Sequence, residues 1–99
     1  MTQESMRTEE THSGARFQFD RLKVEAERVC YRVTVSWPEG SASVDVELHP
    51  NGAVKLGEPS APLAPWMADN VSAFARVLAK NYDPQAGWPR LVHRWRAPK

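Results

Sequence analysis

The sequence predicts an α+β fold. A three- or four-stranded antiparallel β-meander is packed on one face by a single C-terminal α-helix and followed by an extended basic arm. Two stretches within residues 29–49 alternate apolar with polar side chains, the pattern of a sheet with one solvated face. Apolar side chains recur at helical spacing over residues 65–82. Residues 84–99 contain tryptophan and arginine but no acidic residue. These ranges place the folded domain at residues 16–83.

The central hairpin is expected to pair residues 29–37 with residues 42–49 across a turn at residues 38–41, which contain Pro and Gly. We expect the register in which Val35 faces Val44. A slip by one residue would bury the charged side chains, so the alternation favours this register. The same register sets Val33 opposite Val46, Tyr31 opposite Leu48, Arg32 opposite Glu47, Thr34 opposite Asp45, and Ser36 opposite Ser43.

A second turn is expected at residues 50–52, Pro-Asn-Gly, before a strand at residues 53–57. A two-residue Asn-Gly turn would direct Val54 and Leu56 to the solvated face. A three-residue loop instead sets Val54 opposite Leu48 and Leu56 opposite Val46 on the apolar face, with Gly52 in the left-handed position. We prefer the three-residue loop because burial and turn chemistry then agree.

Residues 17–26 fit two structures. Phe17 and Phe19 alternate as in a strand, and the apolar residues from Leu22 onwards alternate in the opposite phase, so a strand needs a bulge near Asp20. The alternative is a short helix capped by Asp20, which residues such as Lys, Glu and Ala favour. We prefer the strand, placed beside residues 29–37.

Residues 65–82 are expected to form the helix, which Pro65 opens after a proline-rich connection. Its apolar stripe should cover the valine face of the hairpin, with Phe74 near the centre. Replacing Phe74 by alanine is therefore expected to cost roughly 3–5 kcal/mol. The stripe consists of Met67, Val71, Phe74, Leu78 and Tyr82.

The length, charge and composition of the chain restrict the functions that it can have. The chain has 99 residues and a net charge of +1, which fit one domain and exclude a globally basic nucleic-acid binder. Residues 1–15 are polar, so we expect a disordered tail. The single cysteine, Cys30, favours cytoplasmic localisation, and no apolar run is long enough for a membrane span.

The basic arm at residues 84–99 allows three interpretations. It packs on the body as a strand or extended segment, with Leu91, His93 and Trp95 facing one way and Val92, Arg94 and Arg96 the other. Alternatively it docks a protein partner, or it holds nucleic acid weakly through arginine and tryptophan. The candidate partner-binding residues are Trp88, Arg90, His93, Arg94, Trp95 and Arg96.

Catalytic, metal-binding and cofactor-binding motifs are not found in the sequence, so we expect neither an enzyme nor a cofactor. The predicted register sets Cys30 opposite His49, a pair that could activate a thiolate, but a sheet face without oxyanion donors does not favour that chemistry. We therefore expect a non-catalytic protein-interaction module: an adaptor, chaperone-like or regulatory subunit. Its partner is another protein or a second copy of itself, and self-association would use a sheet edge or an aromatic surface. The alternative is a nucleic-acid-binding accessory protein.

Overall fold

The computed structural model describes residues 14–26 and 28–97. These residues form five strands and one helix: β1 (Ala15–Glu25), β2 (Arg28–Trp37), β3 (Gly40–Leu48), β4 (Val54–Leu56), α2 (Pro65–Lys80) and β5 (Leu91–Arg96). Most of the tail predicted for residues 1–15 lies outside the described residues. Ala15, however, is buried and begins β1, so the folded domain begins one residue before the predicted boundary.

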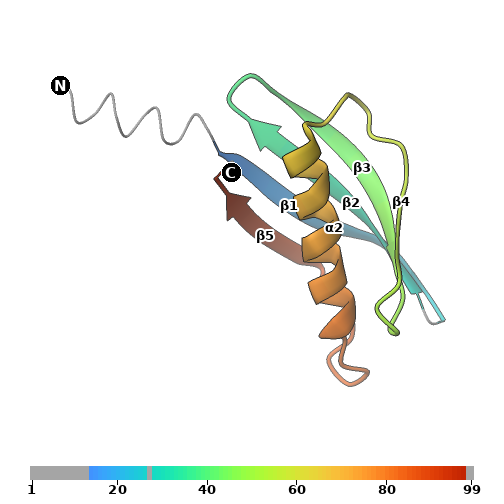
Figure 1. The fold of residues 1–99 in the computed structure, drawn as a ribbon. Helices are drawn as coiled ribbons and strands as arrows, with labels where there is room; N and C mark the ends of the chain where they lie inside the picture. Colours follow the sequence, from blue (N-terminus) through green and yellow to red (C-terminus); the bar gives the residue numbers. More distant parts are fainter. Residues whose placement is uncertain (1–13, 27, 98–99) are drawn as a thin grey trace.

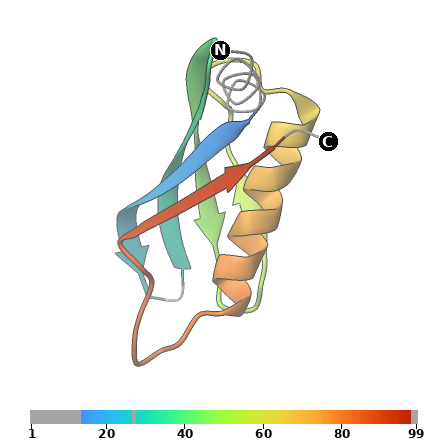
Figure 2. The ribbon, with the colours of Figure 1, turned by 90° about the vertical axis from the view of Figure 1, so that its left-hand side faces the viewer.

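The strands form one antiparallel sheet in the order β4-β3-β2-β1-β5 (Figure 1). Seen from the side in Figure 2, α2 lies against one face of this sheet. The predicted α+β class, antiparallel meander and single covering helix are confirmed. The sheet has five strands rather than three or four, because residues 91–96 of the basic arm pair with β1. Among the described residues, no helix is long and apolar enough to cross a membrane.

The predicted register of the β2–β3 hairpin is wrong by two residues. Val33, not Val35, faces Val44, and Val35 faces Ala42. The hairpin closes through Pro38 and Glu39 alone, so Trp37 pairs directly with Gly40. Because both strands alternate with period two, a shift by two residues keeps every side chain on its predicted face. The pattern therefore predicts the buried face but not the register, which the turn decides.

The β3–β4 turn agrees with the three-residue prediction. Leu48 faces Val54, and Val46 faces Leu56. Gly52 has φ of 95°, the left-handed conformation that glycine adopts without steric cost. Its N–H donates to the carbonyl of His49 at 2.9 Å, which closes the loop.

Residues 17–25 lie in β1, so the strand is confirmed and the alternative helix is wrong. The β1–β2 register shifts between Arg21 and Lys23, which is the bulge that the phase change predicted. Before the bulge Phe17 and Phe19 are fully buried, whereas Leu22, the unpaired residue at the bulge, is half-exposed. Burial of the two phenylalanines against the helix outweighs the helical propensity of the residues that follow.

The helix covers the core as predicted. Met67, Val71 and Phe74 are buried on its inner face, and the Phe74 ring meets the Phe17 ring edge-on at 5.2 Å between centroids. The helix begins at Pro65 as expected and ends at Lys80, two residues before the predicted end.

The part of the β3 edge that β4 leaves unpaired is covered by the chain that follows β4. Gly57 N–H donates to the Asp45 carbonyl at 2.8 Å, and Ser60 N–H donates to the Ser43 carbonyl at 2.7 Å. Ser43 N–H in turn donates to the hydroxyl of Ser60 at 2.8 Å. The proline-rich connection thus continues the bonding of β3 after β4 has ended.

Candidate functional site at the C-terminal edge strand

The chain enters β5 through a fixed corner. Trp88 is buried and stacks on Tyr82 with 4.3 Å between ring centroids. The Arg21 guanidinium donates to the Trp88 carbonyl at 2.8 Å. The Tyr31 hydroxyl donates to the Pro89 carbonyl, and burial raises the pKa of Tyr31 to about 12. These contacts determine where β5 begins and how it meets β1.

In β5, the backbone N–H and C=O groups of every second residue point away from the sheet. Leu91 lies opposite Asp20, and the Arg21 N–H donates to the Arg90 carbonyl at 3.0 Å. Residues of an antiparallel pair alternate between those that bond across the ladder and those that do not. Since Arg90 bonds to β1, the N–H and C=O groups of Leu91, His93 and Trp95 point away from the sheet.

Side chains of β5 alternate between the two faces of the sheet. Val92 is buried beside Phe19 under the helix, and Arg94 and Arg96 lie on the same face. The Arg96 guanidinium lies 5.0 Å from the centre of the Phe74 ring. Leu91, His93 and Trp95 lie on the face that α2 does not cover, and Leu91 and Trp95 are each 49% exposed. The predicted alternation of the arm is therefore confirmed.

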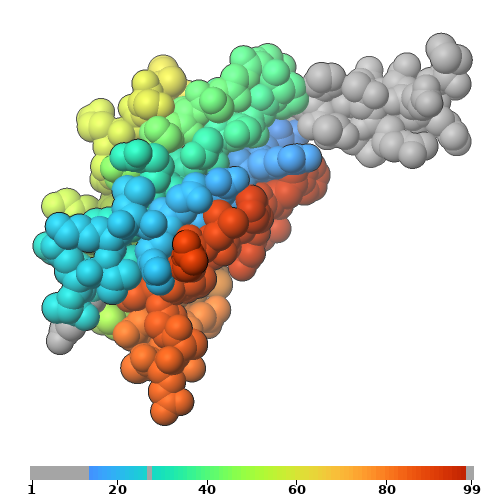
Figure 3. Space-filling model, turned by 180° about the vertical axis from the view of Figure 1, so that it is seen from behind, coloured from blue at the N-terminus to red at the C-terminus, as the bar shows by residue number. Residues whose placement is uncertain are grey.

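The outer edge of β5 lies at the margin of the molecule (Figure 1). Seen from behind in Figure 3, β5 and β1 run side by side across the uncovered face. One outward carbonyl of β5 is bonded within the strand: the Arg94 guanidinium donates to the His93 carbonyl at 2.7 Å. A flexible arginine thus occupies the centre of the exposed edge.

Trp95 borders a hollow at the end of the sheet. Its indole lies so close to Gly14 that a Cβ there would come within 2.4 Å of the ring. The hollow measures about 380 Å³ and is lined by Gly14, Ala15, Arg16, Ser36, Trp37, Pro38 and Trp95. Two tryptophans from different strands, together with Arg16, therefore surround one open cavity.

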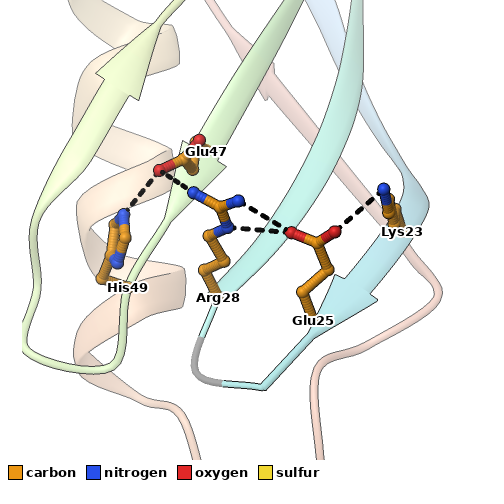
Figure 4. Close-up of polar contacts among 5 residues, drawn as sticks. All are labelled: Lys23, Glu25, Arg28, Glu47 and His49. Atoms are coloured by element: carbon orange, nitrogen blue, oxygen red, sulfur yellow. Dashed lines mark hydrogen bonds and ion pairs between the residues drawn. The ribbon is translucent and has the colours of Figure 1, made fainter.

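The hairpin tips at the other end of the sheet carry an ion-pair network (Figure 4). Arg28 bonds to Glu25 at 2.9 Å and reaches Glu47 at 3.5 Å. Lys23 pairs with Glu25 at 2.9 Å, and His49 contacts Glu47 at 2.7 Å. The bond from His49 lowers the pKa of Glu47, and the bonds from Lys23 and Arg28 lower the pKa of Glu25. All five side chains are solvent-accessible, so the network contributes little to stability.

The predicted Cys30–His49 pair is not formed. Cys30 lies opposite Glu47 on β3 and opposite Lys23 on β1. The cause is the two-residue change of register, which moves His49 past the end of the β2–β3 ladder. Across residues 14–26 and 28–97, no group of three His, Cys, Asp or Glu side chains is placed to hold a metal ion.

The six candidate partner-binding residues fall into four environments. Trp88 belongs to the core, and Arg90 lies at the corner before β5. His93 and Trp95 lie on the uncovered face. Arg94 and Arg96 lie on the helix side. Sequence analysis missed Arg16 and Trp37 as neighbours of Trp95, because only the pairing of β1 with both β2 and β5 brings them together.

Comparison of the chain with known protein families, with curated proteins and with solved structures gives no match.

Proposed function

We propose that this chain is a non-catalytic protein-interaction module that takes up an extended strand of its partner along β5. The observation that carries the proposal is the edge formed by Leu91, His93 and Trp95. Their backbone groups point away from the sheet, and two half-exposed apolar side chains lie directly beside them. An added strand would satisfy these groups and cover the apolar side chains. The module would serve as an adaptor, a chaperone-like subunit or a regulatory subunit.

The physical basis is strand addition, in which main-chain hydrogen bonds supply affinity and alternate side chains supply specificity. The indole of Trp95 is a rigid anchor of the kind that dominates binding energy at interfaces. The contacts of Tyr31 and Trp88 hold the edge in place before binding, which reduces the entropy lost on association. The single Cys30 agrees with a reducing, cytoplasmic setting.

The test uses proline at an outward-facing N–H. In His93→Pro the N–H that faces a partner is lost, whereas the bonds of Val92 and Arg94 to β1 are retained. We expect capture of a native partner from lysate to be lost while circular dichroism is unchanged. The matched control is Leu56→Pro, which alters an outward N–H at the opposite edge and should retain the partner. Equal capture by both variants would contradict the proposal.

A second candidate function, binding of single-stranded nucleic acid, is favoured by the surroundings of Trp95. Arg16, His93, Arg94 and Trp95 line a hollow of about 340 Å³ near the end of β5. Arginine on phosphate with indole stacked on a base would give weak, salt-dependent binding. Titrating the protein with oligonucleotides at low and high salt tests this function. Salt-sensitive quenching that Trp95→Leu abolishes would support it, and no quenching would exclude it.

A further inference from the structure

We infer that the strand bound along β5 belongs to a different protein and alternates acidic with apolar side chains. This inference rests on the proposed function and specifies its partner. It follows from three features of β5: the distribution of its charges, the bond that Arg94 makes at the edge, and the result of pairing β5 with a copy of itself.

The two faces of β5 require different side chains from an added strand. Neighbouring strands place directly opposed side chains on the same face. On the helix side, side chains of the partner would meet Arg94 and Arg96, and on the other face they would meet Leu91 and Trp95. Carboxylates suit the first face and apolar groups suit the second. A strand with period-two alternation of these two types matches both faces at once.

Within the described part of the chain, β1 places no charged side chain opposite the arginines of this edge. The residues opposite Arg94 and Arg96 on β1 are Phe17 and Ala15, which carry no charge. Asp20 lies opposite Leu91 on the other face, where it accepts a hydrogen bond from Gln18 at 2.9 Å. Residues 84–99 contain four basic and no acidic residues. A partner that brings carboxylates therefore supplies the missing counter-charge.

Arg94 links the addition of a partner strand at this edge to the charge of that strand. Its guanidinium now donates to the outward carbonyl of His93 at 2.7 Å. A partner N–H that bonds to this carbonyl would replace the guanidinium. The guanidinium would then be free to bond to a carboxylate of the partner, and charge-assisted bonds of this kind are the stronger ones. A basic or neutral strand would displace Arg94 without offering it a new partner.

A second copy of β5 fits this edge less well. In a symmetric antiparallel pair, residues of one face oppose residues of the same face. A twofold axis through His93 places Arg90 opposite Arg96 of the second copy. A twofold axis through Val92 places Arg90 opposite Arg94 of the second copy, and one through Arg94 places the two copies of Arg94 opposite each other. Each of these registers opposes arginine to arginine, which is destabilising in a sheet.

Two synthetic peptides test the inference with the full chain. Both are capped and about eight residues long, a length within the range of strands in ordinary sheets. The first alternates glutamate with valine, and the second has lysine in place of each glutamate. Amide hydrogen exchange is followed by NMR at neutral pH. We expect the glutamate peptide to bind at least about tenfold more tightly, since several exposed ion pairs add. It should protect the amides of Leu91, His93 and Trp95, whereas those of Val92 and Arg94 are protected with or without peptide.

Substitutions distinguish the effect of charge on binding from the effect of backbone pairing at the edge. Arg94→Gln should weaken binding of the glutamate peptide by about two- to fivefold, with little effect on the lysine peptide. The matched control is Arg76→Gln on the exposed face of α2, which should leave both affinities unchanged. His93→Pro should abolish binding of both peptides.

The outcomes distinguish the inference from the function on which it rests. Equal binding of both peptides would overturn the inference that the partner strand is acidic, but would leave the proposal that β5 accepts a strand. A concentration-dependent doubling of mass in light scattering, lost in His93→Pro, would also overturn it and identify a second copy as the partner. Failure of both peptides and of any self-association, with oligonucleotide quenching of Trp95, would overturn the proposed function itself.

Discussion

The two edges of the sheet differ in how their backbone groups are satisfied. At the β4 edge, the strand ends after three residues and the chain turns back to bond to β3 through Gly57 and Ser60. At the β5 edge, the strand runs for six residues, and the groups of Leu91, His93 and Trp95 face outwards. The open edge on the β4 side is thus only three residues long, whereas the open edge of β5 is six residues long.

An open edge beside apolar side chains is either an aggregation hazard or a binding site. The arginines of residues 90–96 reduce the hazard, because symmetric pairing of two copies about Val92, His93 or Arg94 opposes arginine to arginine. The difference between the edges therefore indicates where a partner strand can be added and why a second copy is not the best occupant. Five experiments disturb or sharpen this difference, and they follow in order of expected effect.

Phe74→Ala should weaken the core that supports both edges. Phe74 is 8% exposed and packs on Phe17, so we expect the free energy of unfolding to fall by roughly 3–5 kcal/mol. Chemical denaturation measures the change. Val77→Ala on the exposed side of α2 is the control and should change stability by less than about 0.5 kcal/mol. A Phe74→Ala protein as stable as the parent would contradict the packing.

Trp88→Ala should loosen the β5 edge more than the β4 edge. The substitution removes the stack on Tyr82 at the corner that leads into β5, at a cost of about 3 kcal/mol. Hydrogen exchange should rise at Val92 and Arg94 more than at Glu47 in β3. Equal increases on both sides of the sheet would show that the corner does not hold β5 in particular.

Alkaline pH should weaken the same corner through Tyr31. Its pKa is raised by burial to about 12 from a usual value of 10.0, so the folded state disfavours ionisation. Stability from this group is complete below pH 10 and is lost as the pH rises towards 12. Tyr31→Phe should remove this dependence, as followed by unfolding at a series of alkaline pH values. An unchanged alkaline slope in Tyr31→Phe would exclude Tyr31 as its source.

Ser60→Ala should weaken the cover of the β3 edge beyond β4. Ser43 N–H would lose the hydroxyl that accepts its bond, at a cost of about 1 kcal/mol. The amide of Ser43 should exchange faster, while the amides of β5 remain unchanged. Ser41→Ala, at an exposed position of the same strand, serves as the control. Unchanged exchange at Ser43 would mean that the hydroxyl does not protect this edge.

The ion-pair network at the hairpin tips should give the smallest effect. The pKa values of Glu25 and Glu47 are lowered in the folded state. Their contribution to the free energy of unfolding is therefore present above pH 4.5 and is lost as the pH falls below it. Glu47→Gln should slightly reduce the acid dependence of unfolding, and high salt should reduce it further. Binding of peptides at β5 should be unaffected, since the network lies at the tips of other hairpins.

Much of the fold could be predicted from the sequence because burial follows local periodicity. The valines of β2 and β3, the bulge in β1 and the helix at Pro65 each leave a pattern of apolar side chains. The register of β2 and β3 could not be predicted in this way, because a shift by two residues preserves the pattern. The two-residue turn at Pro38 and Glu39 decides the register, and nothing in the alternation specifies the length of that turn.

The candidate site was predicted in part. Trp95, His93 and the arginines of β5 were identified by residue type, yet Trp88 shares that composition and is buried in the core. Pairing with β1 determines which backbone groups of β5 face outwards, and that pairing joins distant parts of the chain. It also brings Arg16 and Trp37 to Trp95. Local patterns do not contain this information.

The pairing of β1 with β5 has a consequence for folding. The first strand of the sheet cannot be flanked on both sides until β5 has been synthesised, so Phe19 lacks the cover of Val92 until then. Contacts between such distant segments form slowly, since loop closure must precede them. The proposed binding surface therefore forms only when β5 has joined the sheet, and a partner that recognises it would bind folded domains and ignore chains in which β5 is still unpaired.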